Sequence, residues 1–122
     1  MDRGILIYGY DKKDATIIKK ELSTILDESF ILKSAIGRES EKIKHIIEES
    51  FENKLDDKKT KVVMFFNIDN FVIQSFLNSF PSEIPRPIFC ALTEHNINWS
   101  FNSLLDHLLE EQAHWQNQNK KP

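Results

Sequence analysis

The sequence predicts a three-layer α/β/α domain, in which a mostly parallel four-stranded sheet lies between two layers of helices. Short apolar runs alternate with amphipathic segments along the whole chain, which is typical of repeated strand–helix units. The length of 122 residues suits one domain with one core. With 40% hydrophobic and 29% charged residues, the composition is that of a globular protein rather than a disordered one. We therefore expect a single domain over residues 1–115 and a polar, frayed tail at 116–122.

The first half of the chain contains two strand signals and one clear helix before its centre. Residues 4–9 form an apolar run bounded by glycines, as expected of a strand covered on both faces. The spacing of apolar residues then changes to three and four, which predicts an amphipathic helix with Asp11 or Asp14 as its N-cap. Residues 30–36 read as a second strand.

A second helix and the clearest strand of the chain follow. Apolar residues at helical spacing over 43–51, preceded by Ser40, predict the helix, and early acidic residues suit its dipole. Residues 53–60 are the most polar interior stretch and should be a flexible connection. The run at 61–66 is then predicted to be the third strand.

The last quarter repeats the alternation. Asn67 or Asp69 can cap a helix over 71–80, which three prolines close before a fourth strand at 88–92. Ser100 is well placed as the N-cap of a final amphipathic helix.

Right-handed crossovers restrict the order of the four strands. We expect the order 2-1-3-4 with parallel neighbours, because it gives each face of the sheet two helices, the first and fourth on one face and the second and third on the other. Residues 5–8 also resemble residues 62–65, which is a hint of two similar halves.

In that order, a topological switch lies between strands one and three, where open α/β sheets bind their ligands. We therefore expect a ligand-binding crevice at the carboxyl ends of strands 1, 3 and 4. Its candidate ligand-binding residues are Tyr10, Asp11, Asn67, Asp69, Thr93, Asn96, Asn98 and Trp99. Helix capping, turn formation and packing against a helix start are the alternative roles for these residues.

The loop at 93–100 gathers a hydroxyl, amides, an imidazole and an indole, but it matches no catalytic signature. We expect this loop to hold one conformation, with at least one Asn side chain bonded to backbone and Trp99 packed at the start of the last helix.

Several classes of function are disfavoured. The net charge is −3 and the basic pairs have acidic neighbours, which is unlike a nucleic-acid binder. No apolar run approaches the length of a membrane span. The single cysteine, Cys90, lies in an apolar run, so we expect a reducing, cytoplasmic setting. The three glycines do not cluster into a phosphate-binding loop, and no cofactor is expected.

Two further patterns bear on metals and on enzymatic activity. His107, Glu111 and His114 share one helix face, where they could bind a metal ion, but a solvated face is the expectation and no metal is predicted. No receiver-type acidic pair follows the first strand, and Cys90 lies within a strand rather than at its end. The absence of a catalytic constellation favours a non-enzymatic role.

The predicted helix 71–80 is apolar nearly all round, and the sheet should have an exposed edge. These features predict a homodimer that uses the third helix, the fourth helix or the edge next to strand four. The candidate interface residues are Phe71, Phe76 and Phe80.

The pattern Thr93-x-x-Asn96-x-Asn98-Trp99-Ser100, followed by Leu104-Leu105, resembles the C-terminal signature of a group of short bacterial and archaeal proteins. These proteins are catalogued as a domain of unknown function, number 3783. The runs at 5–10 and 62–65 are also similar. The resemblance implies no activity, but it directs attention to the loop at 93–99.

Two hypotheses of different classes remain. The chain is either a non-enzymatic binding or assembly module that self-associates, or a small-ligand-binding domain that uses the predicted crevice. The sequence does not identify the ligand, a protein partner or a pathway.

Overall fold

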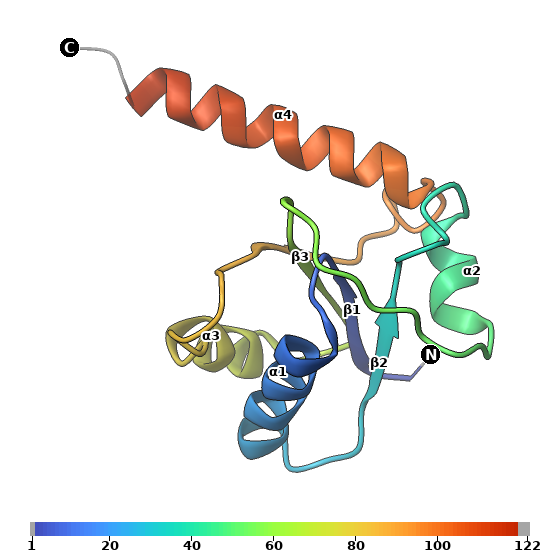
Figure 1. Cartoon of the computed structure of the whole chain (residues 1–122), viewed down its shortest axis with the longest axis vertical. Helices are drawn as coiled ribbons and strands as arrows, with labels where there is room; N and C mark the ends of the chain where they lie inside the picture. The colour runs from blue at the N-terminus through green and yellow to red at the C-terminus, as the bar shows by residue number, and fades with distance from the viewer. Residues whose placement is uncertain (1, 120–122) are drawn as a thin grey trace.

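The computed structural model describes residues 2–119, with side chains to residue 115. Four strands and four helices alternate along the chain (Figure 1). Their bounds are β1 Gly4–Tyr8, α1 Lys12–Ile25, β2 Ile31–Ser34, α2 Ile43–Glu48, β3 Val62–Phe66, α3 Asn70–Asn78, β4 Ile88–Ala91 and α4 Phe101–Asn119. Residues 116–119 thus continue α4, and the rest of the predicted tail lies outside the described residues.

The predicted fold class and strand order are confirmed. One four-stranded sheet has the order β2-β1-β3-β4, and two of its three strand pairs are parallel. The expectation that the central pair is also parallel was wrong, because β1 and β3 are antiparallel, with Gly4 opposite Phe66 and Tyr8 opposite Val62. The long connection between α2 and β3 allows this reversal, since it lets the chain return to the sheet from its other end.

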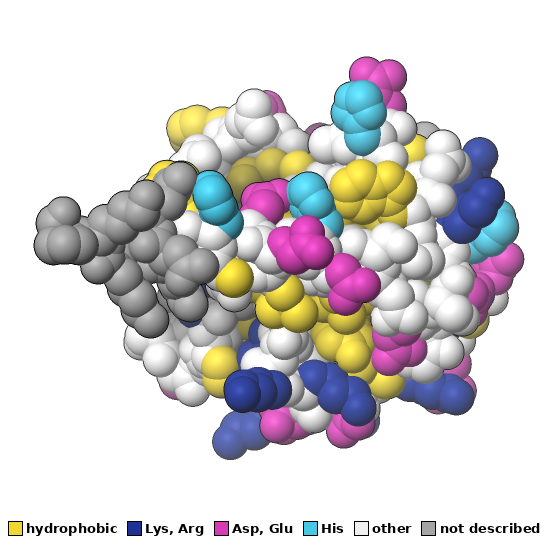
Figure 2. All heavy atoms as spheres, turned by 90° about the horizontal axis from the view of Figure 1, so that it is seen from above, with side chains coloured by type: hydrophobic (Ala, Val, Ile, Leu, Met, Phe, Trp, Pro, Cys, Tyr) yellow, Lys and Arg dark blue, Asp and Glu magenta, His cyan; other side chains and the backbone are white. Residues whose placement is uncertain are grey.

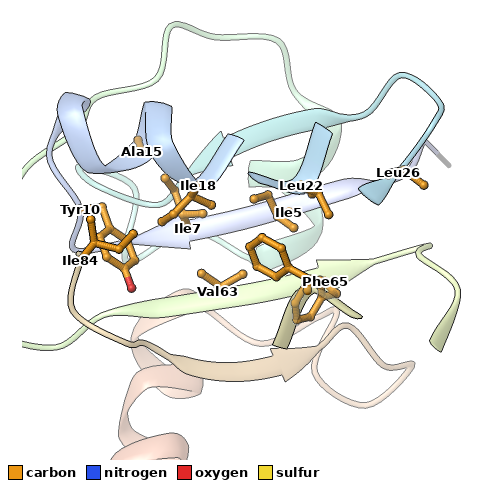
Figure 3. Close-up of a cluster of buried hydrophobic side chains, with 11 residues drawn as sticks. Ile5, Ile7, Tyr10, Ala15, Ile18, Leu22, Leu26, Val63, Phe65 and Ile84 are labelled. Atoms are coloured by element: carbon orange, nitrogen blue, oxygen red, sulfur yellow. The ribbon is translucent and has the colours of Figure 1, made fainter. Parts of the chain in front are cut away.

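The reversal also changes which helices share a face. The side chains of α1 and α3 form one core with Ile5, Ile7, Val63 and Phe65. Those of α2 and α4 form the other core with Leu6, Val62, Met64 and Phe66. Figure 3 shows the first core, in which Ile18 and Leu22 of α1 point toward β1. The prediction that α1 and α4 lie on the same face of the sheet was therefore wrong. When two neighbouring strands are antiparallel and their right-handed crossovers lead to opposite sides of the sheet, the two crossover helices lie on the same face.

The two halves of the chain are related by a pseudo-twofold axis normal to the sheet. The register pairs Leu6 with Met64 at the centre of β1 and β3, so each β1 residue corresponds to the β3 residue 58 positions later. The outer strands are related in the same way with a spacing of 57 residues, since Gly4 lies beside Ile31 and its counterpart Val62 lies beside Ile88. The expected likeness of the two halves is thus present in the fold itself.

A second contact between the halves obeys the same symmetry. Lys42 and Ser100, again 58 residues apart, form an isolated antiparallel bridge where α2 and α4 begin. The amides of Ile43 and Phe101 donate to Trp99 O and Glu41 O, at 2.8 and 3.0 Å. The pseudo-twofold axis also relates two further bonds to each other, from Lys44 N to Ile97 O and from Asn102 N to Glu39 O. The chain is therefore an internal pseudo-dimer of two βαβα units.

Candidate functional site

The antiparallel central pair removes the predicted crevice. The carboxyl end of β1 lies beside the amino end of β3, so Tyr10 and Asp11 lie where β1 ends and β3 begins. Asn67 and Asp69 follow the carboxyl end of β3, which lies at the opposite end of the strands, and Thr93 follows the carboxyl end of β4 at that same end. The eight candidate ligand-binding residues therefore do not converge on one cavity, and the expectation of a shared crevice was wrong.

Tyr10 is a core residue. Its side chain is fully buried against Ile84 (Figure 3), and its hydroxyl donates to Pro85 O at 2.6 Å. This burial raises the pKa of the Tyr10 phenol well above its ordinary value. Tyr10 thus joins the start of α1 to the segment before β4 and presents no group to a ligand.

The acidic and amide residues after β1 and β3 shape equivalent turns. Gly9 and Asn67, which correspond by symmetry, have positive φ angles of 90° and 59°. Two residues later, Asp11 and Asp69 are the N-caps of α1 and α3. Because both pairs recur at the same place in each unit, their role is to turn a strand into a helix.

Asn96 organises the loop at 93–99. Its Oδ1 accepts from Thr93 N at 2.8 Å, and its Nδ2 donates to Ala91 O at 3.1 Å. The Thr93 hydroxyl accepts in turn from Asn96 N, at 3.1 Å. The half-buried Trp99 packs on the α2/α4 core and against the His107 ring, while Asn98 is exposed. The prediction that an Asn side chain bonds backbone and that Trp99 packs at the start of α4 is confirmed.

The three predicted interface residues have different environments. Phe76 is fully buried between Phe65 and Phe89 in the core of its own chain, so it offers no surface. Phe80 is half-buried and packs edge-on against Phe89. Phe71 is 78% exposed. Only Phe71 and Phe80 are therefore accessible to a partner.

The outer edge of β2 is closed by the chain itself. In the parallel pair with β1, Ile31 N and Ala35 N bond toward β1, so Leu32 and Ser34 direct their backbone groups outward. Asn53 satisfies two of these four outward groups, because its Oδ1 accepts from Ser34 N at 2.9 Å and its Nδ2 donates to Leu32 O at 2.9 Å. One amide side chain thus takes two of the hydrogen bonds that a neighbouring strand would make.

The segment that carries Asn53, residues 49–55, is held along β2, and we call it the strap. The guanidinium of Arg38 bonds Glu49 at 2.5 Å and lies 3.7 Å from the Phe51 ring centre. Lys33 Nζ donates to Glu49 O at 2.6 Å, from the strand beneath. The sequence predicted Phe51 inside the second helix and Asn53 in a flexible connection; α2 instead ends at Glu48, which leaves the strap extended.

The outer edge of β4 has no such cover within the described residues. Ile88 N and Leu92 N bond Lys61 O and Phe65 O of β3, so Phe89 and Ala91 direct their backbone groups outward. The Ala91 carbonyl accepts from Asn96, but no hydrogen bond within the described part of the chain engages Phe89 N, Phe89 O or Ala91 N. Where β2 has its strap, β4 presents an open edge.

Apolar side chains line this open edge on both faces of the sheet. Phe80 and Phe89 pack together on the α1/α3 face, and both stay half-buried. Ile88 and Cys90 lie on the α2/α4 face, where the exposed Leu109 lies across a cavity of about 460 Å³ from Ile88. Burial raises the pKa of the Cys90 thiol to about 12, so it is a poor nucleophile at neutral pH.

The outer face of α4 is polar. Figure 2 shows acidic and histidine side chains over this helix, with hydrophobic side chains between them. His107 Nε2 pairs with Glu111 at 2.5 Å, and both side chains are about half exposed, as the predicted solvated face requires. In the described part of the chain, no helix combines the length and hydropathy needed to cross a bilayer.

The fold is thus that of a small α/β protein made of two symmetric βαβα units. Residues 61–114, which lie in the second unit, match the family described as Domain of unknown function (DUF3783). The matched segment begins just before β3 and ends within α4, so it contains the loop at 93–99 and the open edge, but not residues 5–10. The chain has no significant match among curated proteins or among solved structures.

Proposed function

We propose that this protein is a non-enzymatic assembly module that associates with itself through the outer edge of β4. The observation that carries the proposal is the open edge itself, where Phe89 N, Phe89 O and Ala91 N have no hydrogen bond within the described residues and half-buried aromatic side chains lie beside them. An uncovered edge strand is a template for pairing, and natural proteins usually protect it. The module would act in a reducing cytoplasm, where Cys90 stays a thiol.

The alternative role as a small-ligand-binding domain receives less support. Of its candidate residues, Tyr10 is buried, Asp11 and Asp69 cap helices, and Asn96 is committed to the backbone of its own loop. These contacts account for four of the eight residues that suggested a ligand.

Sedimentation equilibrium over low to high micromolar concentrations tests the proposal. We expect the mass to rise from 14.3 kDa toward twice that value as concentration increases. Ala91→Lys places a charge on the exposed edge and should hold the protein at the monomer mass.

Ala113→Lys is the matched control, because it makes the same change at an exposed position of α4 and should leave association unchanged. A wild-type mass that stays at 14.3 kDa over the whole range would overturn the proposal. So would an equal effect of both variants, because it would show that the edge is not involved.

A further inference from the structure

The outer edge of β4 can accept a neighbouring strand only over a short window. Pro87, at one end, has no amide hydrogen. Thr93, at the other end, has its N–H occupied by Asn96 Oδ1. Between them, Phe89 and Ala91 are the residues whose backbone groups point away from β3. Any partner strand must therefore match the spacing of these two residues.

This window is complementary to itself. If a second β4 lies antiparallel with Cys90 opposite Cys90, then Phe89 of each copy faces Ala91 of the other. Each of these two pairs exchanges both of its backbone hydrogen bonds. The Ala91 carbonyl can accept one of them beside its bond from Asn96, because a carbonyl oxygen has two lone pairs. All the outward groups of the window are then satisfied at once.

The charges beside the strand follow the same symmetry. Arg86 and Glu94 lie four residues before and four residues after Cys90, and both are exposed. Arg86 precedes β4 and Glu94 lies in the turn that follows it, so the antiparallel register brings Arg86 of one copy to the same end of the contact as Glu94 of the other, on each side of the axis. The Arg86 guanidinium is held in place, since it donates to Leu77 O at 3.2 Å and lies 5.0 Å from the Phe89 ring centre.

From these observations we infer that two copies of this chain pair their β4 strands antiparallel about a twofold axis at Cys90, with Arg86 of each copy opposite Glu94 of the other. The inference rests on the self-association proposed above and specifies its partner and register. The two four-stranded sheets become one continuous sheet, and the half-buried Phe80 and Phe89 of both copies gather on one face. A second copy fits this edge because it supplies both the matching window and the opposite charge.

Charge reversal in the full-length protein tests the register. Arg86→Glu and Glu94→Arg each place like charges at both contacts, and each should raise the dissociation constant about tenfold, which corresponds to about 1.4 kcal/mol over the two exposed contacts together. The double variant R86E/E94R restores opposite charges and should return the dissociation constant to the wild-type value. Arg86→Gln separates the loss of attraction from the repulsion and should give a smaller increase.

The outcomes separate this inference from the proposed function. A wild-type dimer that is weakened by Ala91→Lys, but whose double variant R86E/E94R is as weak as the single variants, overturns the antiparallel register and leaves the assembly role in place. A wild-type monomer at high micromolar concentration overturns both. Recovery in the double variant, with circular dichroism equal to wild type in all variants, supports the inference.

Discussion

The two outer strands occupy equivalent positions in the two units, yet one edge is closed and the other is open. On β2, the Asn53 side chain bonds two outward backbone groups at the middle of the edge, Leu32 O and Ser34 N. On β4, the Asn96 side chain bonds Ala91 O from the loop beyond the strand, but Phe89 N, Phe89 O and Ala91 N have no hydrogen bond in the described structure. The difference shows that the open edge is a property of the second unit alone and not a consequence of the fold.

The cause lies in the segment that follows the second helix of each unit. After α2, which ends at Glu48, the chain is extended and runs as the strap along β2. In the second unit, α4 continues as a helix of 19 residues. The residue equivalent in sequence to Asn53 is therefore Glu111, which lies within this helix and not in an extended segment. A longer helix extends one core but leaves its neighbouring edge strand uncovered.

Symmetric core positions should show the largest effect, because both units depend on them. Ile18 in α1 and Phe76 in α3 are 58 residues apart and fully buried on the same face. Phe76→Ala should cost about 3–5 kcal/mol and Ile18→Ala about 2–5 kcal/mol in the free energy of unfolding. Urea denaturation measures both, and the exposed Phe71→Ala, with an effect near zero, is the control.

Removing the Asn53 side chain from the β2 edge should have the next largest effect on stability. Asn53→Ala leaves Ser34 N and Leu32 O without partners and should cost about 1–3 kcal/mol of stability. It should also give the β2 edge the tendency to associate that we assign to β4, visible as a rise in mass at high concentration. Asn102→Ala, at an exposed site of α4, is the control. Unchanged stability and unchanged mass would show that the strap does not protect β2.

The loop at the end of β4 offers a comparison between two neighbouring amides. Asn96→Ala removes bonds to Thr93 N and Ala91 O and should cost about 1–3 kcal/mol. Asn98→Ala changes an exposed side chain and should stay within about 0.5 kcal/mol of wild type. Equal effects in thermal or chemical denaturation would contradict the structural role that we give to Asn96.

The equivalent helix caps should give the smallest effects. The Asp11 carboxylate accepts from Asp14 N at 2.9 Å, whereas Asp69 accepts from Phe71 N at 3.5 Å. Asp11→Ala should therefore cost about 1 kcal/mol, and Asp69→Ala should cost less. The opposite ranking in urea denaturation would show that hydrogen-bond length does not decide the strength of these two caps.

Local patterns predicted the eight elements and the caps Asp11, Asp69 and Ser100, because spacing and capping chemistry act over a few neighbouring positions. The strand order was predicted from the balance of helices on the two faces. The direction of β3 could not be predicted in this way. It depends on where the strap lets the chain re-enter the sheet, and the polar residues 53–60 carry no periodic signal. The candidate crevice failed for the same reason. Asn53 was missed as well, since its partners on β2 are about 20 residues away in sequence.

Amide hydrogen exchange at single-residue resolution, measured at low and high protein concentration, tests the central claim most directly. Ser34 N is bonded to Asn53, so it should be protected at both concentrations. Phe89 N and Ala91 N should exchange rapidly in the monomer and become protected as the mass doubles. Phe89 and Ala91 amides that stay unprotected while the mass doubles would contradict the account, because the copies would then be meeting through another surface.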